Sequence, residues 1–310
     1  MTGATGAADA AGAAGATDAA DAAVSNGSSG RLFYYSITAA LAGFLFGFDT
    51  VVISGAEQTI QRLWNLSAGV HGFAMGAALY GTVLGSLVGS WPADRYGRRP
   101  TLLGVGVLFL VSAIGSAVAQ NATVFIVARF VGGLGIGIST VAAPMYISEI
   151  APPEKRGRLA AMFQFNIVLG IVIAFASNAL LAKIVGGPDA WRWMLGVAAV
   201  PSLIYSIMCL GLPESPRWLA MRNGEWGVGS GTQSEGFWSW RLRVPIALAF
   251  LVAFFNQLSG INAILYFAPR IFALSGLGEQ AALLQSVGIG VTNLLFTFVD
   301  RKSTRLNSSH

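Results

Sequence analysis

The sequence predicts an all-α, multi-spanning membrane protein, and three observations support this fold class. Hydrophobic residues make up 54% of the 310 residues and charged residues only 11%, whereas a soluble domain carries about 25% charged residues. Apolar runs of about 20 residues, the length that crosses a bilayer, recur along the chain. The 39 glycines and 8 tryptophans also fit, because Gly is frequent where membrane helices touch and Trp at membrane interfaces.

Eight segments have the length and polarity of membrane spans. They are expected at residues 33–54, 72–92, 101–119, 123–148, 160–184, 191–212, 244–271 and 281–299. The Gly- and Ser-rich residues 221–243 are expected to link a six-helix bundle, residues 31–220, to two further helices in residues 244–300. Residues 1–30 form an Ala/Gly/Asp-rich tail that cannot bury a core. The last ten residues, 301–310, resemble translated adaptor or cloning sequence and are left out of the fold prediction.

The distribution of Lys and Arg predicts the orientation of the spans. If residue 31 is cytoplasmic, fourteen of the nineteen Lys and Arg residues face the cytoplasm and four face outward, with Arg129 inside a span. Cytoplasmic loops carry the excess of positive charge, so both termini are expected in the cytoplasm and the protein in the cell membrane. The same asymmetry accounts for the net charge of +5 without a nucleic-acid partner.

The scarcity of Cys and His excludes several kinds of site. The single Cys209 lies in an apolar run, which leaves no disulfide framework and no cysteine-based metal site. The two histidines are His71, expected in a short loop, and the terminal His310. They are too few for a His-rich metal centre or a readily built Ser-His-Asp triad, so we expect no metal, no cofactor and no enzyme.

Asp49 and Arg129 are the clearest candidates for a functional pair. A charge within a spanning helix is costly and indicates function. Both residues are expected roughly 8–10 Å below the outer end of their helices, at about 1.5 Å per residue, so a salt bridge is possible. Asp can bind and release a proton whereas Arg stays charged, which would make the pair a proton-operated latch. The alternative is a purely structural ion pair.

Three loops on the predicted cytoplasmic side mix acidic and basic residues. In residues 89–100, Asp94 stands at a helix end beside three arginines; in residues 144–159, Glu149 is expected to face a basic cluster that includes Lys155; and residues 213–219 hold a further pair. A breakable network of this kind could form a cytoplasmic gate, and the alternative is a set of solvated, uncoupled loops. The expected gate residues are Asp94, Arg95, Arg98, Arg99, Glu149, Arg156, Arg158, Glu214 and Arg217.

Glycines recur on the second and fourth spans. Gly81, Gly85 and Gly89 are four residues apart, and residues 132–137 hold four more. We expect them to let helices approach closely. A nucleotide loop is disfavoured because no strand precedes them.

The stretch "AFFNQLSGINAILYFAP", residues 253–269, places amides inside an apolar helix. Asn256, Ser259, Asn262 and Tyr266 fall within about 120° of arc on an ideal helix and form one polar stripe. Gln257 lies off the stripe, but unwinding at Gly260 would bring it back. Amides both donate and accept hydrogen bonds, as hydroxyls do, so a neutral polyhydroxylated ligand is expected. The alternative is that the amides join helices. Further amides on spans five and eight are Gln164 and Asn293.

These motifs resemble the sugar porter branch of the major facilitator superfamily. The resemblance covers residues 33–220 and 244–299, and its specific motifs are "DRYGRR", "PESPRWL" and "QLSGINAILYFAP". It implies a twelve-helix fold in two six-helix halves that works by alternating access, with a monosaccharide or polyol and protons as ligands and a monomer in the bilayer. It also implies that Asp49 and Arg129 couple protons. The positions that match sugar contacts are Gln164, Gln257, Asn262 and Asn293, with Asn256 standing where the family usually has Gln.

The chain also departs from that pattern. Ile171 occupies a position that is polar in some symporters, Ser90 stands where the gate motif often has Gly, and the linker is shorter than usual. Spans nine to twelve are absent, so the expected molecule is a truncated major facilitator fold: a complete N-terminal half plus the first two helices of the C-terminal half. The expected function is proton–sugar symport, inactive in this form. A facilitative uniporter and a non-transporting sugar sensor are the alternatives.

Overall fold

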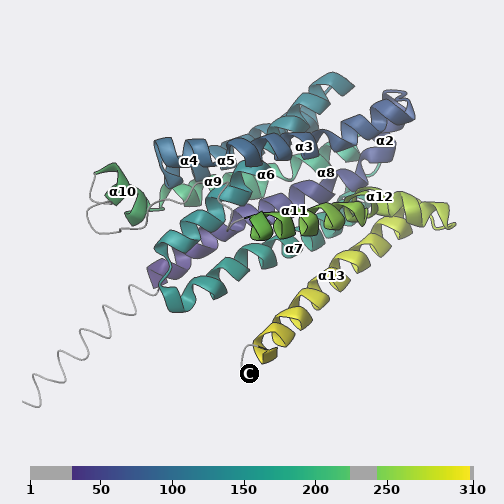
Figure 1. Ribbon diagram of the computed structural model, residues 1–310. Helices are drawn as coiled ribbons and strands as arrows, with labels where there is room; N and C mark the ends of the chain where they lie inside the picture. Colours follow the sequence, from purple (N-terminus) through teal and green to yellow (C-terminus); the bar gives the residue numbers. More distant parts are fainter. Residues whose placement is uncertain (1–29, 224–242, 308–310) are drawn as a thin grey trace, which may run out of the picture.

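The computed structural model describes residues 30–223 and 243–307, and every regular element in these two ranges is helical (Figure 1). The first helix and its terminal 3-10 turn η1 (Ile53–Gly55) cover Gly30–Gly55. The helices that follow are α2 (Glu57–Leu63), α3 (Ala68–Val88), α4 (Ser90–Tyr96), α5 (Arg98–Val118), α6 (Ala122–Ile150), α7 (Pro153–Ile184), α8 (Ala190–Gly196), α9 (Ala199–Leu210), α10 (Pro216–Arg222), α11 (Arg243–Leu258), α12 (Ile261–Leu274) and α13 (Glu279–Asn307).

The eight predicted spans are confirmed within the described ranges. Eight helical segments are long and apolar enough to cross a membrane: Gly30–Gly55, Ala68–Val88, Arg98–Val118, Ala122–Ile150, Lys155–Ile184, Ala190–Leu210, Arg243–Leu274 and Glu279–Val299. The second span begins and ends earlier than the predicted range 72–92, because Ser67 caps its first turn and the helix is interrupted at Gly89 before α4.

Three predicted regions fall partly or wholly outside the described residues. The tail is described only at Gly30, and the linker only at residues 221–223 and 243. That residues 301–310 do not belong to the fold stays a prediction, although α13 continues through them as far as Asn307.

Close glycine contacts join α3 to α6, as the sequence predicts. A Cβ atom added at Gly81 would collide with the carbonyl oxygen of Phe130, and one at Gly133 with that of Ala78. The two helices therefore touch backbone to backbone. The first helix packs against α7 in the same way, since a Cβ at Gly47 would collide with the backbone of Ile167. The first helix and α6 are also the two most buried of the eight spans, so their charged residues are shielded.

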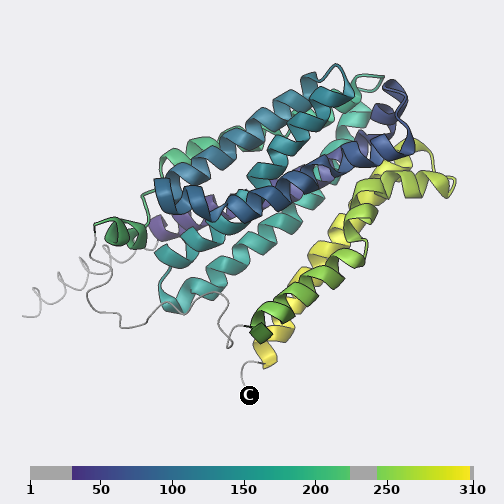
Figure 2. The same cartoon turned by 45° about the horizontal axis from the view of Figure 1, so that its top comes forward.

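The C-terminal helices lie along one side of this bundle (Figure 2). α11 and α12 are separated at Gly260, whose φ of 74° lies in the left-handed region that favours glycine. α13 packs on α7, where Gly290 approaches the Cα atom of Val172. α11 buries none of its side chains, so its amide side chains are not packed into the core of the molecule.

Candidate functional site

The structure brings Asp49 and Arg129 together inside the N-terminal bundle. Nη1 of Arg129 donates to Oδ1 of Asp49 at 2.7 Å, and Nη2 donates to the Asp49 backbone oxygen at 2.9 Å. Only 4% of Asp49 and 1% of Arg129 is exposed. A charge buried this deeply is tolerated only because its partner is in contact.

The pair retains spare hydrogen-bonding capacity. Oδ2 of Asp49 and Nε of Arg129 are buried without a hydrogen-bond partner, as is the hydroxyl of the neighbouring Ser112. Gly132 separates these groups: a Cβ there would lie 3.6 Å from Asp49 Oδ2 and would collide with Ser112 Oγ. The phenol of Tyr266, carried by α12, lies within electrostatic range of both charges. One carboxylate oxygen of Asp49 thus holds Arg129, while the other makes no hydrogen bond within the described parts of the chain.

At the arginine-rich end of the bundle, Arg98 is the centre of a buried network. Its Nε and Nη2 donate to the two carboxylate oxygens of Glu149 at 2.9 and 2.8 Å, and its Nη1 lies 3.1 Å from Asp94 Oδ1. Arg98 and Glu149 are each 3% exposed at the side chain, whereas Asp94 is 62% exposed. The sequence predicts that Glu149 faces Lys155, Arg156 and Arg158, but its carboxylate pairs with Arg98. Of the three expected residues, Arg156 lines a pocket together with Glu149, while Lys155 and Arg158 are exposed.

Glu214 joins the same network through the backbone. Its Oε1 accepts from the amide nitrogens of Arg98 and Arg99 at 2.8 and 3.2 Å, so it caps the beginning of α5. An anion is stabilised at a helix N-terminus. Gly97, at φ 107°, brings the backbone close to this carboxylate. Trp218, which the sequence analysis did not select, adds a 2.8 Å hydrogen bond from Nε1 to the Asp94 backbone oxygen.

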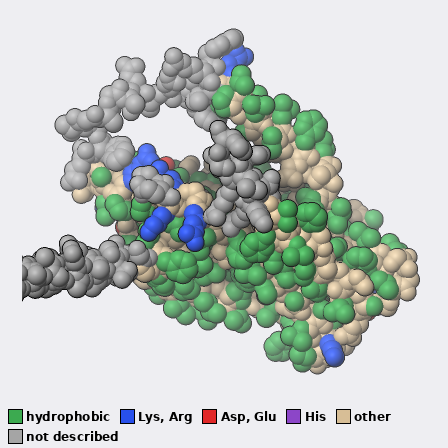
Figure 3. Space-filling view, turned by 90° about the horizontal axis from the view of Figure 1, so that it is seen from below, with side chains coloured by type: hydrophobic (Ala, Val, Ile, Leu, Met, Phe, Trp, Pro, Cys, Tyr) green, Lys and Arg blue, Asp and Glu red, His purple; other side chains and the backbone are tan. Residues whose placement is uncertain are grey.

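The remaining predicted gate residues lie around this network. Arg99 donates from Nη2 to the Leu210 backbone oxygen at 2.8 Å. Arg156 and Arg217 line one pocket together with Glu149. Arg95 and Arg158 are exposed. In Figure 3, Lys and Arg side chains gather near one end of the molecule, whereas hydrophobic side chains cover most of the visible surface. That distribution fits a protein surrounded by lipid with one basic end.

Two of the predicted sugar-contacting amides meet at the break between α11 and α12. Nδ2 of Asn262 donates to Oε1 of Gln257 at 2.9 Å. The turn at Gly260 thus brings Gln257 to the polar stripe, as the sequence indicated. Asn256 and Gln164 are exposed, on α11 and α7, and Asn293 is partly buried on α13. Within the described parts of the chain, no hydrogen bond joins these three side chains to Gln257 or Asn262.

Sequence analysis missed a second polar cluster at the opposite end of the bundle. Arg270 on α12 contacts Glu57 and Gln61 on α2, and Glu57 also contacts His71 on α3. His71 is buried in the first turn of α3, so its predicted place in a loop is wrong. The spacing of Glu57 and Gln61, four residues apart on one face of a helix, is the sequence feature that could have indicated this cluster. Their partner Arg270 lies more than 200 residues away along the chain, so the spacing does not identify it.

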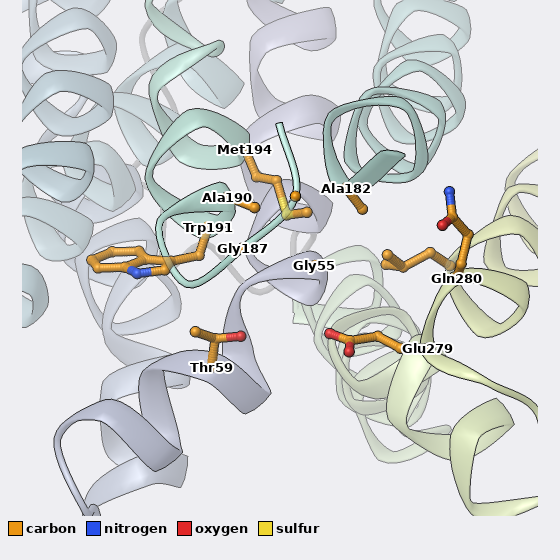
Figure 4. Close-up of a pocket in the computed structure, with 11 residues that line it drawn as sticks. Gly55, Thr59, Ala182, Gly187, Ala190, Trp191, Met194, Glu279 and Gln280 are labelled. Carbon is orange, nitrogen blue, oxygen red and sulfur yellow. The ribbon is translucent and has the colours of Figure 1, made fainter. Parts of the chain in front are cut away.

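A polar cavity of about 210 Å³ lies at this same end of the molecule. It is lined by η1, α2, α7, α8 and α13, which means that both parts of the chain contribute to it. In Figure 4 the side chains of Thr59 and Glu279 point toward each other across the cavity. The N-terminal bundle and the C-terminal helices thus enclose polar space between them.

Buried ion pairs within a bundle of spanning helices, with a polar break in the seventh span, are typical of helical membrane transporters. The family model described as "Sugar (and other) transporter" matches residues 35–227 and 228–301. The chain belongs to this sugar transporter family, within the major facilitator superfamily.

Several curated proteins are similar over most of this chain. The arabinose-proton symporter of Bacillus subtilis is 35% identical over 302 residues, which cover 88% of this chain and 65% of the symporter. The D-xylose-proton symporter of Escherichia coli is 31% identical, covering 87% of this chain and 66% of the relative. The chain therefore spans about two thirds of the length of these curated relatives.

A solved structure gives the same picture of the fold. The partially occluded inward-open form of the xylose transporter XylE from E. coli matches with a TM-score of 0.75 and 30% identity, covering 88% of this chain and 71% of XylE. The predicted fold class, an all-α major facilitator architecture, is thereby confirmed.

Proposed function

We propose that this chain is the larger part of a proton-coupled symporter for a monosaccharide or polyol, which works by alternating access. The related arabinose-proton and D-xylose-proton symporters support both the sugar and the proton. We place the arginine-rich end in the cytoplasm, with both termini, because positive charge is retained on that side. The protein would act as a monomer in the cell membrane.

The observation that carries the proposal is the buried Asp49–Arg129 pair. An ionised Asp49 attracts Arg129 at 2.7 Å, whereas a protonated Asp49 loses most of that attraction. Proton binding from outside would therefore free Arg129 and allow the first helix and α6 to change their packing. A uniporter has no need of a titratable group at this position, which favours symport over facilitated diffusion.

The sugar would be bound between the two parts of the chain. Gln257 and Asn262 sit at a helix break, which is the usual construction of a transporter site near the membrane midplane. Their mutual hydrogen bond holds both amides in one place, and each keeps further donors or acceptors for hydroxyl groups. Gln164 on α7 and Asn293 on α13 would add contacts to the sugar from two other helices. Asn256, next to Gln257 on α11, would add a further contact.

The Arg98 network would act as the cytoplasmic gate. Arg98 and Glu149 bind the ends of α4, α5 and α6 to one another. Glu214 binds the segment before α10 to the start of α5, and Trp218 links α10 to α4. Such charge-assisted bonds hold a closed arrangement but can be exchanged for water when the helices move apart. The relatives' greater length supports a further proposal: four more spans follow in the complete transporter and close the sugar site from the other side.

The experiment that tests symport is sugar-driven proton entry. Cells that express the complete transporter should alkalinise a weakly buffered medium when arabinose, xylose or glucose is added. Asp49→Asn should abolish the alkalinisation, while the same change at the exposed Asp189 should leave it intact. Sugar uptake without proton entry would instead establish the uniporter, and sugar binding without uptake would establish the sensor.

A further inference from the structure

The Glu57 cluster, composed of Glu57, Gln61, His71 and Arg270, joins the two parts of the chain at the end opposite the Arg98 network. Figure 1 shows α2 and α12 at one end of the bundle and α4 and α10 at the other. Nη1 of Arg270 lies 3.3 Å from Glu57 Oε2 and donates to Gln61 Oε1 at 2.9 Å. One guanidinium nitrogen thus holds two side chains that are one helical turn apart on α2.

His71 contacts the same carboxylate oxygen of Glu57 as Arg270 does. Its Nε2 lies 3.3 Å from Glu57 Oε2 and 3.2 Å from the Glu57 backbone oxygen. Glu57 is 1% exposed, and its Oε1 is buried without a partner. The Arg270 side chain is 38% exposed and provides a single contact to the carboxylate. The cation therefore offsets only part of the cost of burying the negative charge.

We propose that this cluster is a closure site: docking of Arg270 seals the outer end, and Glu57 takes up a proton as it is buried. The role in closure rests on the proposed transport function, whereas the contacts of the cluster between the two parts of the chain are seen directly in the structure. It adds a second proton-binding carboxylate to the mechanism, distinct from Asp49 and located between the parts rather than within the bundle.

Electrostatics give the direction of the pH dependence. Burial raises the pKa of the Glu57 carboxyl from its ordinary value of 4.5 to about 7, although Arg270 and Arg62 oppose the rise. When the outer end opens and water reaches Glu57, its pKa should return toward the ordinary value. The closed state then binds the proton more tightly than the open state, so closure is favoured as the pH falls below about 7 and is weakened as the pH rises through it.

Other charged groups around Glu57 are few in the described part of the chain. Arg62 lies on the same helix, Arg270 on α12 and His71 on α3, and Glu279 faces the neighbouring cavity from α13. His71 is the second titratable group in contact with Glu57. A neutral His71 donates one hydrogen bond, which a glutamine can also supply. The substitution His71→Gln therefore separates the titration of His71 from that of Glu57.

The experiment is a distance measurement between spin labels across the outer end. Labels at Leu63, the last residue of α2, and Leu274, the last residue of α12, are both on exposed positions. They would be placed in the complete transporter, in nanodiscs, with Cys209 replaced by Ala. A second pair at Leu63 and Trp193 reports on the N-terminal bundle alone and serves as the control for folding.

We expect the ratio of short to long Leu63–Leu274 distances to rise roughly ten-fold between pH 8 and pH 5.5, because closure captures a proton. Glu57→Gln, a neutral isostere, should remove the pH dependence and favour the short distance throughout. Arg270→Gln should reduce the short-distance population at every pH, and Arg270→Lys should restore part of it. The Leu63–Trp193 distance should not change.

Three results would overturn the proposal: equal distances at all pH values, an unchanged pH response in Glu57→Gln, or a response abolished by His71→Gln. If Glu57→Gln does not fold, the Arg270 pair of variants still decides whether the cluster closes the outer end. The distances require no transport, so a failed closure site is distinguishable from a failed symport proposal.

Discussion

The N-terminal bundle and the C-terminal helices use their polar residues in opposite ways. Within residues 30–223, Arg129 and Arg98 are 1% and 3% exposed, and each is bound to a buried carboxylate. Within residues 243–307, α11 buries no side chain, and Gln257 is exposed. The buried arginines of the N-terminal bundle are thus paired with carboxylates inside the protein, whereas the amides of α11 remain accessible to a ligand. We infer that the N-terminal bundle holds the proton and the C-terminal helices provide most of the sugar contacts.

The largest expected effect comes from leaving out the further spans that the complete transporter adds to the two regions. If the sugar site needs both of them together with further spans, the 310-residue chain should show no sugar uptake in transporter-deficient cells, while the complete transporter restores it. Equal membrane expression of the two forms is the control. Uptake by the shorter form at a rate near that of the complete form would contradict a site built between halves.

The fold could be predicted from the sequence because its signals are local. Span length, glycine spacing and the basic loops lie within short windows, and the eight spans are found within a few residues of their predicted places. The Asp49–Arg129 contact could also be predicted, because a charge in hydrocarbon needs a partner at similar depth.

The partners that depend on tertiary packing could not be predicted in the same way. Glu149 stands close in sequence to Lys155 but binds Arg98, 51 residues away. Glu214 binds backbone amides rather than a basic side chain, which no charge pattern reveals. The Glu57–Arg270 contact joins two parts of the chain that have no shared motif. Local charge spacing thus identifies candidate residues without identifying their partners.

A second prediction concerns the buried network of the N-terminal bundle. Glu149→Ala should destabilise the protein by about 3–5 kcal/mol, because it leaves the Arg98 charge buried without its main partner. Asp94→Ala removes the exposed partner of the same arginine and should cost at most about 1 kcal/mol. Thermal unfolding in detergent measures both. Equal melting temperatures for the two variants would show that the buried pair contributes no more than the exposed one.

A third prediction concerns the amides of the C-terminal helices. Gln257→Ala or Asn262→Ala should weaken sugar binding by about ten-fold or more, since a ligand hydroxyl is left unpaired in a dry site. The melting temperature without sugar should change little, because both side chains lie outside the packed core. Gln120→Ala, at an exposed position between α5 and α6, is the control. Normal affinity with a lowered melting temperature would assign the amides to helix packing.

The central claim is that the N-terminal bundle binds the proton and the C-terminal helices provide most of the sugar contacts. The most direct test is to measure steady-state sugar accumulation by the Asp49→Asn and Gln257→Ala variants of the complete transporter. Asp49→Asn removes the titratable proton with little change in size, so sugar should exchange across the membrane but not accumulate against a gradient. Gln257→Ala should still accumulate sugar, at higher external concentrations than the unmodified transporter requires. Accumulation by Asp49→Asn, or its loss in Gln257→Ala at saturating sugar, would contradict the account.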